Sequence, residues 1–490
     1  MRPGATPARP SVRRTLLAAS VPCAVLALAA RPAAAHQFTS RFDSPVPLSL
    51  LFAGAGATVA ATALLLARAP EIPAVDRRLG SVPAAAGDAL AAVARVGFLL
   101  AFVAVLADGV SGPRAPAENF ATLFAWSPWL KGLALVSVVA GSPWRTLSPW
   151  RTLYDALCRV EGGEIRLRAY PAALGHWPAL VGFLLLVGVA ENLTRVPTLP
   201  RATAVLVAGY ALSMLVGALL FGREWFERGD AFHVLYDLLG RAAPLSATRS
   251  EAGRWVVRLR APWSACSAPV PTRTAAAFVV AAVYTVTFDG FAESPPYWDA
   301  YFGVREAFGV GASVSVVLYE AGLLGFLLGY AAVVAVAERV AAAGRRRVGT
   351  AGRPSPAETD GGAESGCTGD GSAPTTPGTL AFAATLVPIA AGYEVAHNLA
   401  YVATTLGRLP TVVGWPSVDP LWWLSTPTYW GTQVLLVVLG HVVAVVAAEA
   451  VARRRTPTRR WALASHAPLV LLMVGYTVLS LWVVSLPVAT

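Results

Sequence analysis

Charged side chains are scarce in this sequence. Asp, Glu, Lys and Arg make up only 14% of the 490 residues, and a single lysine, Lys131, stands among the 39 basic residues. Hydrophobic residues reach 56%. A soluble chain of this length would form roughly three domains, each with a charged surface. The composition instead favours one helical bundle in lipid.

Several sequence motifs of enzymes are also absent. The chain has no His-Glu-x-x-His zinc motif, no Gly-x-Ser-x-Gly nucleophile elbow, no Walker phosphate loop and no Gly-x-Gly-x-x-Gly fingerprint. Three of its four cysteines, Cys158, Cys266 and Cys367, fall in loops predicted to be cytoplasmic, and no Cys-x-x-Cys pair occurs. These absences remove support from recognised hydrolase mechanisms, ATP-driven pumping and a disulfide framework.

Ten long apolar stretches dominate what is present. A spanning helix needs roughly 20 mostly apolar residues, and backbone groups in hydrocarbon must be satisfied within a helix. The sequence therefore predicts an all-α, polytopic transmembrane bundle of about ten spans. The predicted spans are 47–67, 89–108, 119–141, 171–191, 202–222, 274–289, 310–337, 379–404, 429–450 and 464–487.

The arginines are distributed asymmetrically between the two sets of alternate loops. Loops 68–88, 142–170, 223–273, 338–378 and 452–463 hold 26 arginines, and the opposite loops hold six. By the positive-inside rule, the arginine-rich loops are cytoplasmic. We therefore expect a multi-pass protein of the cell membrane with its mature N-terminus and its C-terminus outside. The net charge of +11 then lies against anionic lipid headgroups, and nucleic acid is not an expected partner.

The first 35 residues have the pattern of a secretion signal. Arginines precede an apolar run at 15–30, and the small residues Ala33-Ala34-Ala35 form a cleavage site. Cleavage after Ala35 would leave His36 at the mature N-terminus. If the signal is not cleaved, the chain has eleven helices.

A polar tract divides the rest of the chain. Residues 338–378 begin with an arginine cluster and continue with Gly, Ser, Thr, Pro and acidic residues, a composition that cannot bury enough surface to fold. We expect a disordered cytoplasmic linker here. It would separate seven helices in 36–337 from three further helices of the same bundle in 379–490.

Two cytoplasmic loops carry distinctive patterns. Phe232, Leu235, Leu238 and Leu239 recur at helical spacing, which predicts an amphipathic helix on the inner surface. Loop 142–153 contains the hexapeptide Ser-Pro-Trp-Arg-Thr-Leu twice in succession. Trp and Arg favour the membrane interface. The predicted interface anchors are Trp144, Arg145, Trp150 and Arg151, with a headgroup or anionic-ligand site as the alternative.

Span 379–404 is the richest in ionisable side chains. Glu394 and His397 are three residues apart, and Asn398 and Tyr401 follow them by four, so all four share one helical face. An ionisable group at membrane depth tends to face a cavity or a partner. Structural pairing, a proton relay and a metal site are the three interpretations of this face.

Other ionisable residues occur at similar predicted depths. Together with Glu394, His397 and Tyr401, the candidates for a substrate or proton path are Glu191, Asp289 and Glu320, which could line an outward-opening pocket. Arg95, Asp108 and Lys131 are expected to neutralise one another or to reach the interface. Gly322, Gly325 and Gly329 are expected to allow close helix packing.

A membrane-embedded metal site is a further hypothesis. A Glu-x-x-His pair is half of the pattern found in di-iron carboxylate bundles, and an N-terminal histidine offers two nitrogens to Cu(II). The candidate ligands are His36, Glu394, His397 and His441. Copper, iron or zinc are the metals considered.

Several segments resemble a family of multi-spanning membrane proteins of high-GC bacteria and salt-loving archaea, some members of which are labelled fenitrothion hydrolase. The likeness is carried by the start of the first span after Asp43-Ser44-Pro45, by the Pro-Trp-Arg-Thr-Leu repeat, by Phe288-Asp289-Gly290-Phe291 and by 394–401. The label implies phosphotriester cleavage. The resemblance assigns no catalytic residue to this chain.

Three classes of function remain open at the level of sequence. A transporter or permease would place the ionisable residues along the path of a small molecule or ion. A metal-binding protein or hydrolase-like enzyme would gather His and Glu within ligand distance, and a structural or assembly protein would leave these groups dispersed. Because the polar groups are spread over several spans, the sequence narrowly favours transport.

Overall fold

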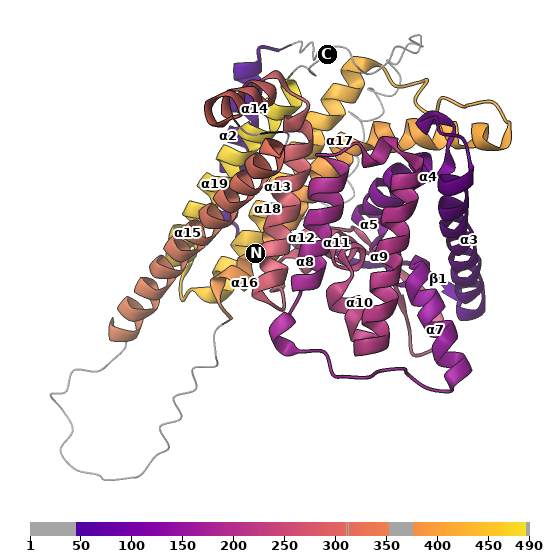
Figure 1. The fold of residues 1–490 in the computed structure, drawn as a ribbon. Coiled ribbons are helices and arrows are strands. Elements are labelled where there is room, and N and C mark those ends of the chain that lie inside the picture. The colour runs from indigo at the N-terminus through magenta and orange to yellow at the C-terminus, as the bar shows by residue number, and fades with distance from the viewer. Residues whose placement is uncertain (1–45, 310, 312, 352–375, 487–490) are drawn as a thin grey trace, which may run out of the picture.

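The computed structural model describes residues 46–309, 311, 313–351 and 376–486 (Figure 1). The predicted signal peptide, His36 and residues 352–375 of the predicted linker lie outside the described residues. Ten helical segments of the described chain are long and apolar enough to cross a membrane. The predicted all-α bundle is therefore confirmed, because each predicted apolar stretch corresponds to one of these segments.

The spans are single helices or short series of helical segments, in which η denotes a 3-10 or π segment. They are α2 (Leu48–Arg68), α3 (Ala84–Ser111), α4–η2–α5 (Phe120–Phe124, Ala125–Gly132, Leu133–Ala140), η3–α8–η4 (Ala172–Leu174, Trp177–Phe183, Leu184–Glu191), α9 (Pro200–Phe221), α13 (Arg273–Ala292), α15 (Val314–Ala351), α16–η6–α17–η7 (Gly378–Ala383, Ala384–Leu386, Val387–Arg408, Leu409–Val413), α18 (Thr426–Arg455) and α19 (Arg459–Ser485).

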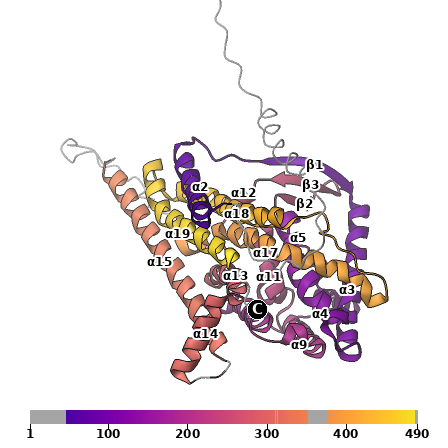
Figure 2. The same cartoon turned by 90° about the horizontal axis from the view of Figure 1, so that it is seen from above.

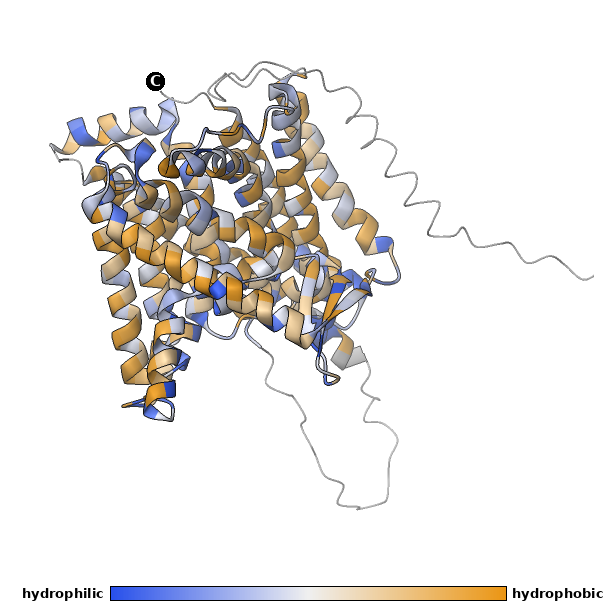
Figure 3. Ribbon diagram, turned by 90° about the vertical axis from the view of Figure 1, so that its right-hand side faces the viewer, coloured by the Kyte–Doolittle hydropathy of each residue, from blue (hydrophilic) through white to orange (hydrophobic). Residues whose placement is uncertain are grey.

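Shorter elements connect the spans. At the end of the bundle formed by the arginine-rich loops, the connecting elements are α6 (Trp144–Leu147), α7 (Pro149–Glu161), α10 (Glu224–Gly229), α11 (Ala231–Gly240) and α12 (Pro262–Cys266). At the arginine-poor end they are η1 (Pro116–Glu118), η5 (Val196–Thr198) and α14 (Pro295–Phe308). Figure 3 shows hydrophobic residues along most of the long helices and hydrophilic residues mainly near their ends.

A small antiparallel sheet occupies the arginine-rich end, where the sequence predicts only loops and helix. Its strands β1 (Asp76–Pro83), β2 (Leu245–Arg249) and β3 (Arg254–Arg260) pair in the order β1-β3-β2 (Figure 2). Apolar residues alternate with arginines in β3, a period that suits a strand. Gly253, at φ +66° in the β2–β3 turn, adopts a conformation that favours glycine.

Arginines tie the segments of this end together. Arg453 donates to the Glu449 carboxylate at 2.8 Å and to the carbonyl of Leu66, near the end of α2. Arg454 binds the carbonyl of Ser267, and Arg455 binds that of Thr376 at 2.6 Å. Cationic side chains near helix C-termini satisfy carbonyls that lack partners. Some predicted lipid-facing arginines therefore bind the protein itself.

The described part of the predicted linker corrects its boundary. Helix α15 does not end near residue 337 but continues to Ala351. Residues 338–351 are helical because alanines and arginines, which favour helix, precede the Gly/Ser/Pro-rich tract.

Candidate functional site

Five ionisable side chains from four spans lie near one another inside the bundle. We call Lys131, Glu191, Asp289, Glu394 and His397 the polar cluster. The Lys131 Nζ lies 3.2 Å from Glu191 Oε1 and 3.6 Å from Asp289 Oδ2. The same Asp289 oxygen lies 3.5 Å from His397 Nε2. Glu394 and Lys131 line one small cavity.

Two members of the polar cluster stand on π-helical segments. Lys131 lies in η2, which also contains Pro128, and Glu191 is the last residue of η4. Proline lacks the N–H that would continue an α-helix. Segments of π-helix are rare in proteins, and those that occur are often found at functional sites. The Tyr236 hydroxyl of α11 lies 3.0 Å from each of the carbonyls of Trp129 and Leu130 in η2. Helix α11 therefore supports the segment that carries Lys131.

The exposure of the cluster changes systematically along it. The side chains of Lys131, Glu191, Asp289 and His397 are 6%, 12%, 21% and 27% exposed. Lys131 lies near the middle of its span, whereas Glu191 and Asp289 lie near the arginine-poor ends of theirs. Exposure therefore rises from the buried Lys131 to the partly exposed Asp289 and His397.

Apolar side chains close the cluster toward the arginine-rich end. The cavity beside Lys131 and Glu394 has a volume of about 30 Å³, which is room for about one water molecule. Leu235 and Leu239 of α11 form part of its wall, and α11 packs against α5, the arginine-rich half of the third span. The helix predicted from these leucines is confirmed, but it lies buried in the bundle rather than on the inner surface.

The repeated hexapeptide binds the start of α11. The indole nitrogens of Trp144 and Trp150 both donate to Asp230 Oδ2 at 2.8 Å. The guanidinium groups of Arg145 and Arg151 bind the two oxygens of Glu227 at 2.5 and 2.8 Å. Each copy of the repeat thus contributes one indole and one guanidinium to the same pair of carboxylates. We call these six residues the repeat clamp.

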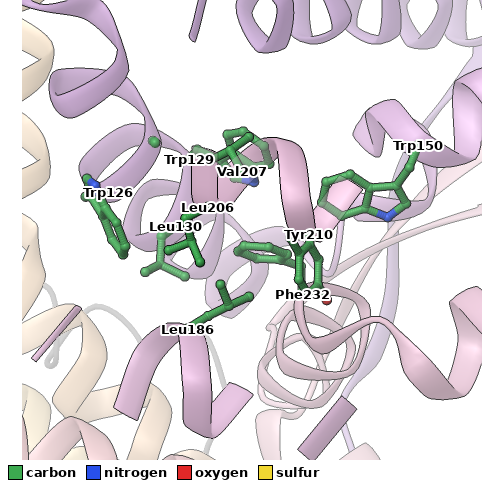
Figure 4. A pocket seen from close by; sticks show the side chains of 10 residues that line it. Trp126, Trp129, Leu130, Trp150, Leu186, Leu206, Val207, Tyr210 and Phe232 are labelled. Carbon is green, nitrogen blue, oxygen red and sulfur yellow. The ribbon is translucent and has the colours of Figure 1, made fainter. Parts of the chain in front are cut away.

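This arrangement corrects the predicted interface anchors. Trp144 and Trp150 are each 1% exposed, so their rings do not reach the lipid interface. They pack in an aromatic group with Tyr210 and Phe232, which also line a small apolar cavity with Trp150 (Figure 4). The indoles are buried because Asp230 accepts their hydrogen bonds inside the protein, so they do not need an acceptor at the lipid headgroups.

Asp230 and Glu227 have separate further partners. Asp230 accepts from the Tyr210 hydroxyl at 3.0 Å and caps α11 through the backbone nitrogen of Phe232. Glu227 lies 3.0 Å from His233 Nε2. Burial alone would raise the pKa of Glu227, but its bonds from His233 and Arg151 outweigh this and lower the pKa to about 2.

Of the other predicted path residues, Glu320 lies outside the cluster and Tyr401 lies at its edge. Glu320 is exposed on α15 and makes no contact with the other four candidates. The side chain of Tyr401 is also exposed, although its carbonyl accepts from the Ser127 hydroxyl of η2 at 3.3 Å. The Tyr401 hydroxyl nevertheless interacts with Ser127 and Glu191. The sequence cannot show which way a span turns an isolated polar residue, and Glu320 faces outward from the packed helices.

The predicted metal ligands do not assemble. Within the described residues, no group of three or more His, Cys, Asp or Glu side chains is arranged to hold a metal ion, and His36 lies beyond them. His397 is paired with Asp289, and Glu394 shares its cavity with the Lys131 ammonium. His441 is buried on α18, where its Nδ1 lies 2.8 Å from the Val437 carbonyl and its ring faces Tyr476. The copper, iron or zinc site predicted from Glu394, His397 and His441 is therefore wrong for these residues.

Lys131 is the site residue whose partners the sequence does not reveal. The expected neutralisation among Arg95, Asp108 and Lys131 is wrong, because Asp108 accepts from the backbone nitrogen of Phe120 and Arg95 donates to the Thr146 carbonyl. One feature of the sequence could have singled out Lys131. It is the only lysine of the chain and lies in the middle of a span, three residues after Pro128.

Comparison with known proteins adds no further information on the site. No protein-family model, no curated protein and no solved structure matches the chain.

Proposed function

We propose that this protein is a transporter of the cell membrane in which the polar cluster binds a proton that enters from outside and couples it to movement of a small molecule or ion. The observation that carries the proposal is the mid-span Lys131 ammonium between the Glu191 and Asp289 carboxylates, with exposure that rises toward His397. Ionisable groups inside a membrane bundle are costly and mark ion and proton pathways.

The distribution of arginines supports the proposed entry of the proton from outside. If the arginine-rich end is cytoplasmic, the exposed part of the cluster faces outside and Leu235 and Leu239 of α11 close it from inside. The exposed arginines of the closed end would then lie beside anionic headgroups. This arrangement corresponds to an outward-facing state.

The other two classes of function receive less support. A metal-dependent or hydrolase-like enzyme requires a gathered set of ligands or catalytic groups, and the described residues offer no metal-binding group. A structural protein would leave its ionisable groups dispersed, whereas Lys131, Asp289 and His397 from three different spans lie within ion-pair distance. No observation favours the phosphotriester cleavage implied by the family resemblance.

Transport also requires a second, inward-facing state. Helix α11 separates the cluster from the arginine-rich end, and the repeat clamp holds it through its N-cap residue Asp230. We infer that α11 moves to open this side. Its movement would break the bonds from Tyr236 to η2 and those of Asp230 to the two indoles of the repeat.

A charge-movement experiment tests the proposal without knowledge of the substrate. Proteoliposomes adsorbed on a solid-supported membrane are exposed to pH jumps on the arginine-poor side. We expect a transient charge displacement in the wild-type protein, because protons would enter the membrane field to reach the cluster. The Asp289→Asn variant should lose most of this displacement.

Glu320→Gln is the matched control, because Glu320 is a carboxylate on a neighbouring span that is exposed and outside the cluster. Its displacement should equal that of the wild type. Equal displacement in wild type and Asp289→Asn, or none in a wild-type protein that elutes as a folded species, would overturn the proposal.

A further inference from the structure

A second, apolar cavity lies between α15 and α19, on the side of α13 away from the polar cluster. Its volume is about 530 Å³, which lies within the roughly 300–1,000 Å³ range of small-molecule sites. Its walls come from α13, from residues 325–333 of α15, from the start of the eighth span and from residues 468–479 of α19. Both views show α15 and α19 side by side (Figures 1 and 2).

Three glycines leave this space open. A Cβ atom added at Gly325, Gly329 or Gly475 would meet no atom within 4 Å. Gly322 behaves differently, since its added Cβ would lie 2.9 Å from the Tyr284 ring carbon Cζ. The expected close packing therefore occurs at Gly322 but not at the other two glycines of α15. Glycine inside a helix lowers stability, and at these positions its result is a cavity rather than a close helix contact.

The cavity continues toward the arginine-poor end. An adjoining cavity of about 270 Å³ shares Phe326 and Leu479 with the first and reaches Phe291, Tyr297 and Trp482. We call the two cavities together the α15–α19 groove. It follows the middle and the arginine-poor half of both spans, so its length runs across the level of the hydrocarbon core.

Two hydroxyl groups of the groove bind backbone carbonyls. The Tyr330 hydroxyl donates to the Thr379 carbonyl at 2.6 Å, and the Tyr476 hydroxyl donates to the Val283 carbonyl at 3.0 Å. No Asp, Glu, Lys, Arg or His lines either cavity. An occupant therefore gains contact mainly with apolar surface, and water would find few partners.

The rim of the groove is accessible from the bilayer. Leu471 and Leu479 of α19 line the groove and are exposed, and Leu324 and Leu328 of α15 beside it are exposed as well. In a membrane these side chains face lipid, so a hydrocarbon chain can enter sideways without passing through water.

We propose that the α15–α19 groove binds a hydrocarbon chain of a membrane lipid. The lining is apolar, the open side faces the bilayer, and the glycines remove the side chains that would otherwise fill the space. The inference does not depend on the proposed transport function, because the groove and the polar cluster share no residue.

Photolabelling in vesicles tests the inference. The protein is reconstituted in phosphatidylcholine that contains a small fraction of a phospholipid with a diazirine halfway along one acyl chain. After illumination, labelled peptides are mapped by mass spectrometry. We expect labelling of 325–333 and 468–479 to exceed that of α3, which is largely unburied, by several-fold per residue.

Two variants that fill the groove with leucine side chains, and one control variant, test whether the groove causes the labelling. Gly325→Leu with Gly329→Leu, or Gly475→Leu from the opposite wall, should reduce labelling of the groove several-fold and leave α3 unchanged. Gly209→Leu fills a helical position that is also open and should have no effect. Labelling equal to that of α3, or insensitive to both fillings in folded protein, would overturn the proposal.

Discussion

Lys131 is the residue on which the polar cluster depends. Its ammonium lies between Glu191 and Asp289, and these carboxylates would face each other without a cation if it were removed. A buried charge that loses its partner typically costs about 3–5 kcal/mol. The cluster is therefore arranged around one positive charge, and its members should not behave independently.

We predict that Lys131→Met lowers the free energy of unfolding in mixed micelles by about 3–5 kcal/mol. The double variant Lys131→Met with Glu191→Gln should recover at least half of this loss, because it removes one of the two stranded carboxylates. Additive losses in the two single variants and the double variant would show that the pair is not coupled.

The lowered pKa of Glu227 predicts how the stability of the protein depends on pH. Its pKa is lowered from 4.5 to about 2 in the fold, so the folded state favours the ionised form. Its stabilising contribution is fully present above pH 4.5 and is lost as the pH falls toward 2. The difference in melting temperature between wild type and Glu227→Gln should shrink as the pH falls from 4.5 to 2.5. A constant difference down to pH 2.5 would contradict this assignment.

At the residue level, the sequence indicated part of the site. Glu191, Asp289, Glu394 and His397 were candidates because ionisable groups are rare in apolar spans, and the structure brings them together. Their role on a substrate path stays a prediction. Glu320 and His441 met the same criterion but lie elsewhere, since rarity does not specify which face of a helix is packed.

The spans are the elements that the sequence predicts best. Continuous apolar runs determine them, and α2, α9 and α19 begin and end within a few residues of the expected positions. The π segments η2 and η4 were not predicted, because they depend on local backbone adjustment in a packed bundle. The sheet was missed since its pairing joins residues 76–83 with 254–260, which are far apart in the sequence.

The approach of α17 to α18 is an element-level feature that can be tested. A Cβ atom added at Gly392 of α17 would lie 2.6 Å from the Leu436 carbonyl oxygen of α18. Gly392→Val should therefore lower the free energy of unfolding by about 1–3 kcal/mol through overpacking. Gly431→Val on α18, where the added atoms meet open space, should change stability by only about 0.5 kcal/mol. Equal losses in both would show that α17 is not tightly packed at this point.

The position of α11 makes a prediction about access from the arginine-rich side. In a cysteine-free background, Ala282→Cys places a thiol in the cavity beside Lys131. Adding Asp230→Asn weakens the bonds from Trp144, Trp150 and Tyr210. Because each bond to a charged group contributes about 1.5–3 kcal/mol, thiol labelling from the arginine-rich side should rise by roughly tenfold or more.

Asp237→Asn is the control for this experiment. Asp237 lies on the same helix but is exposed and outside the repeat clamp, so its substitution should leave the labelling rate unchanged. Labelling that responds equally to both substitutions would indicate general loosening of α11 rather than release from the clamp.

At the scale of the whole molecule, the two ends of the bundle differ in construction. The arginine-rich end is closed by α11, the repeat clamp and the sheet, and arginines such as Arg453 bind helix ends there. The arginine-poor end leaves Asp289 and His397 partly exposed. The sequence predicts this asymmetry of charge, but it cannot predict that the arginine-rich end is also the sealed end, because that depends on how α11 folds back into the bundle.

We propose that the polar cluster opens to the outside and is sealed from the cytoplasm. The most direct test is the labelling of a His397→Cys variant by a membrane-impermeant thiol reagent, in a cysteine-free background and in right-side-out and inside-out vesicles. Ser250→Cys, beside the exposed β2–β3 turn, reports the arginine-rich side, which we propose is cytoplasmic. We predict that the thiol at position 397 is labelled only in right-side-out vesicles and the thiol at position 250 only in inside-out vesicles. Labelling of position 397 in inside-out vesicles alone would contradict the claim.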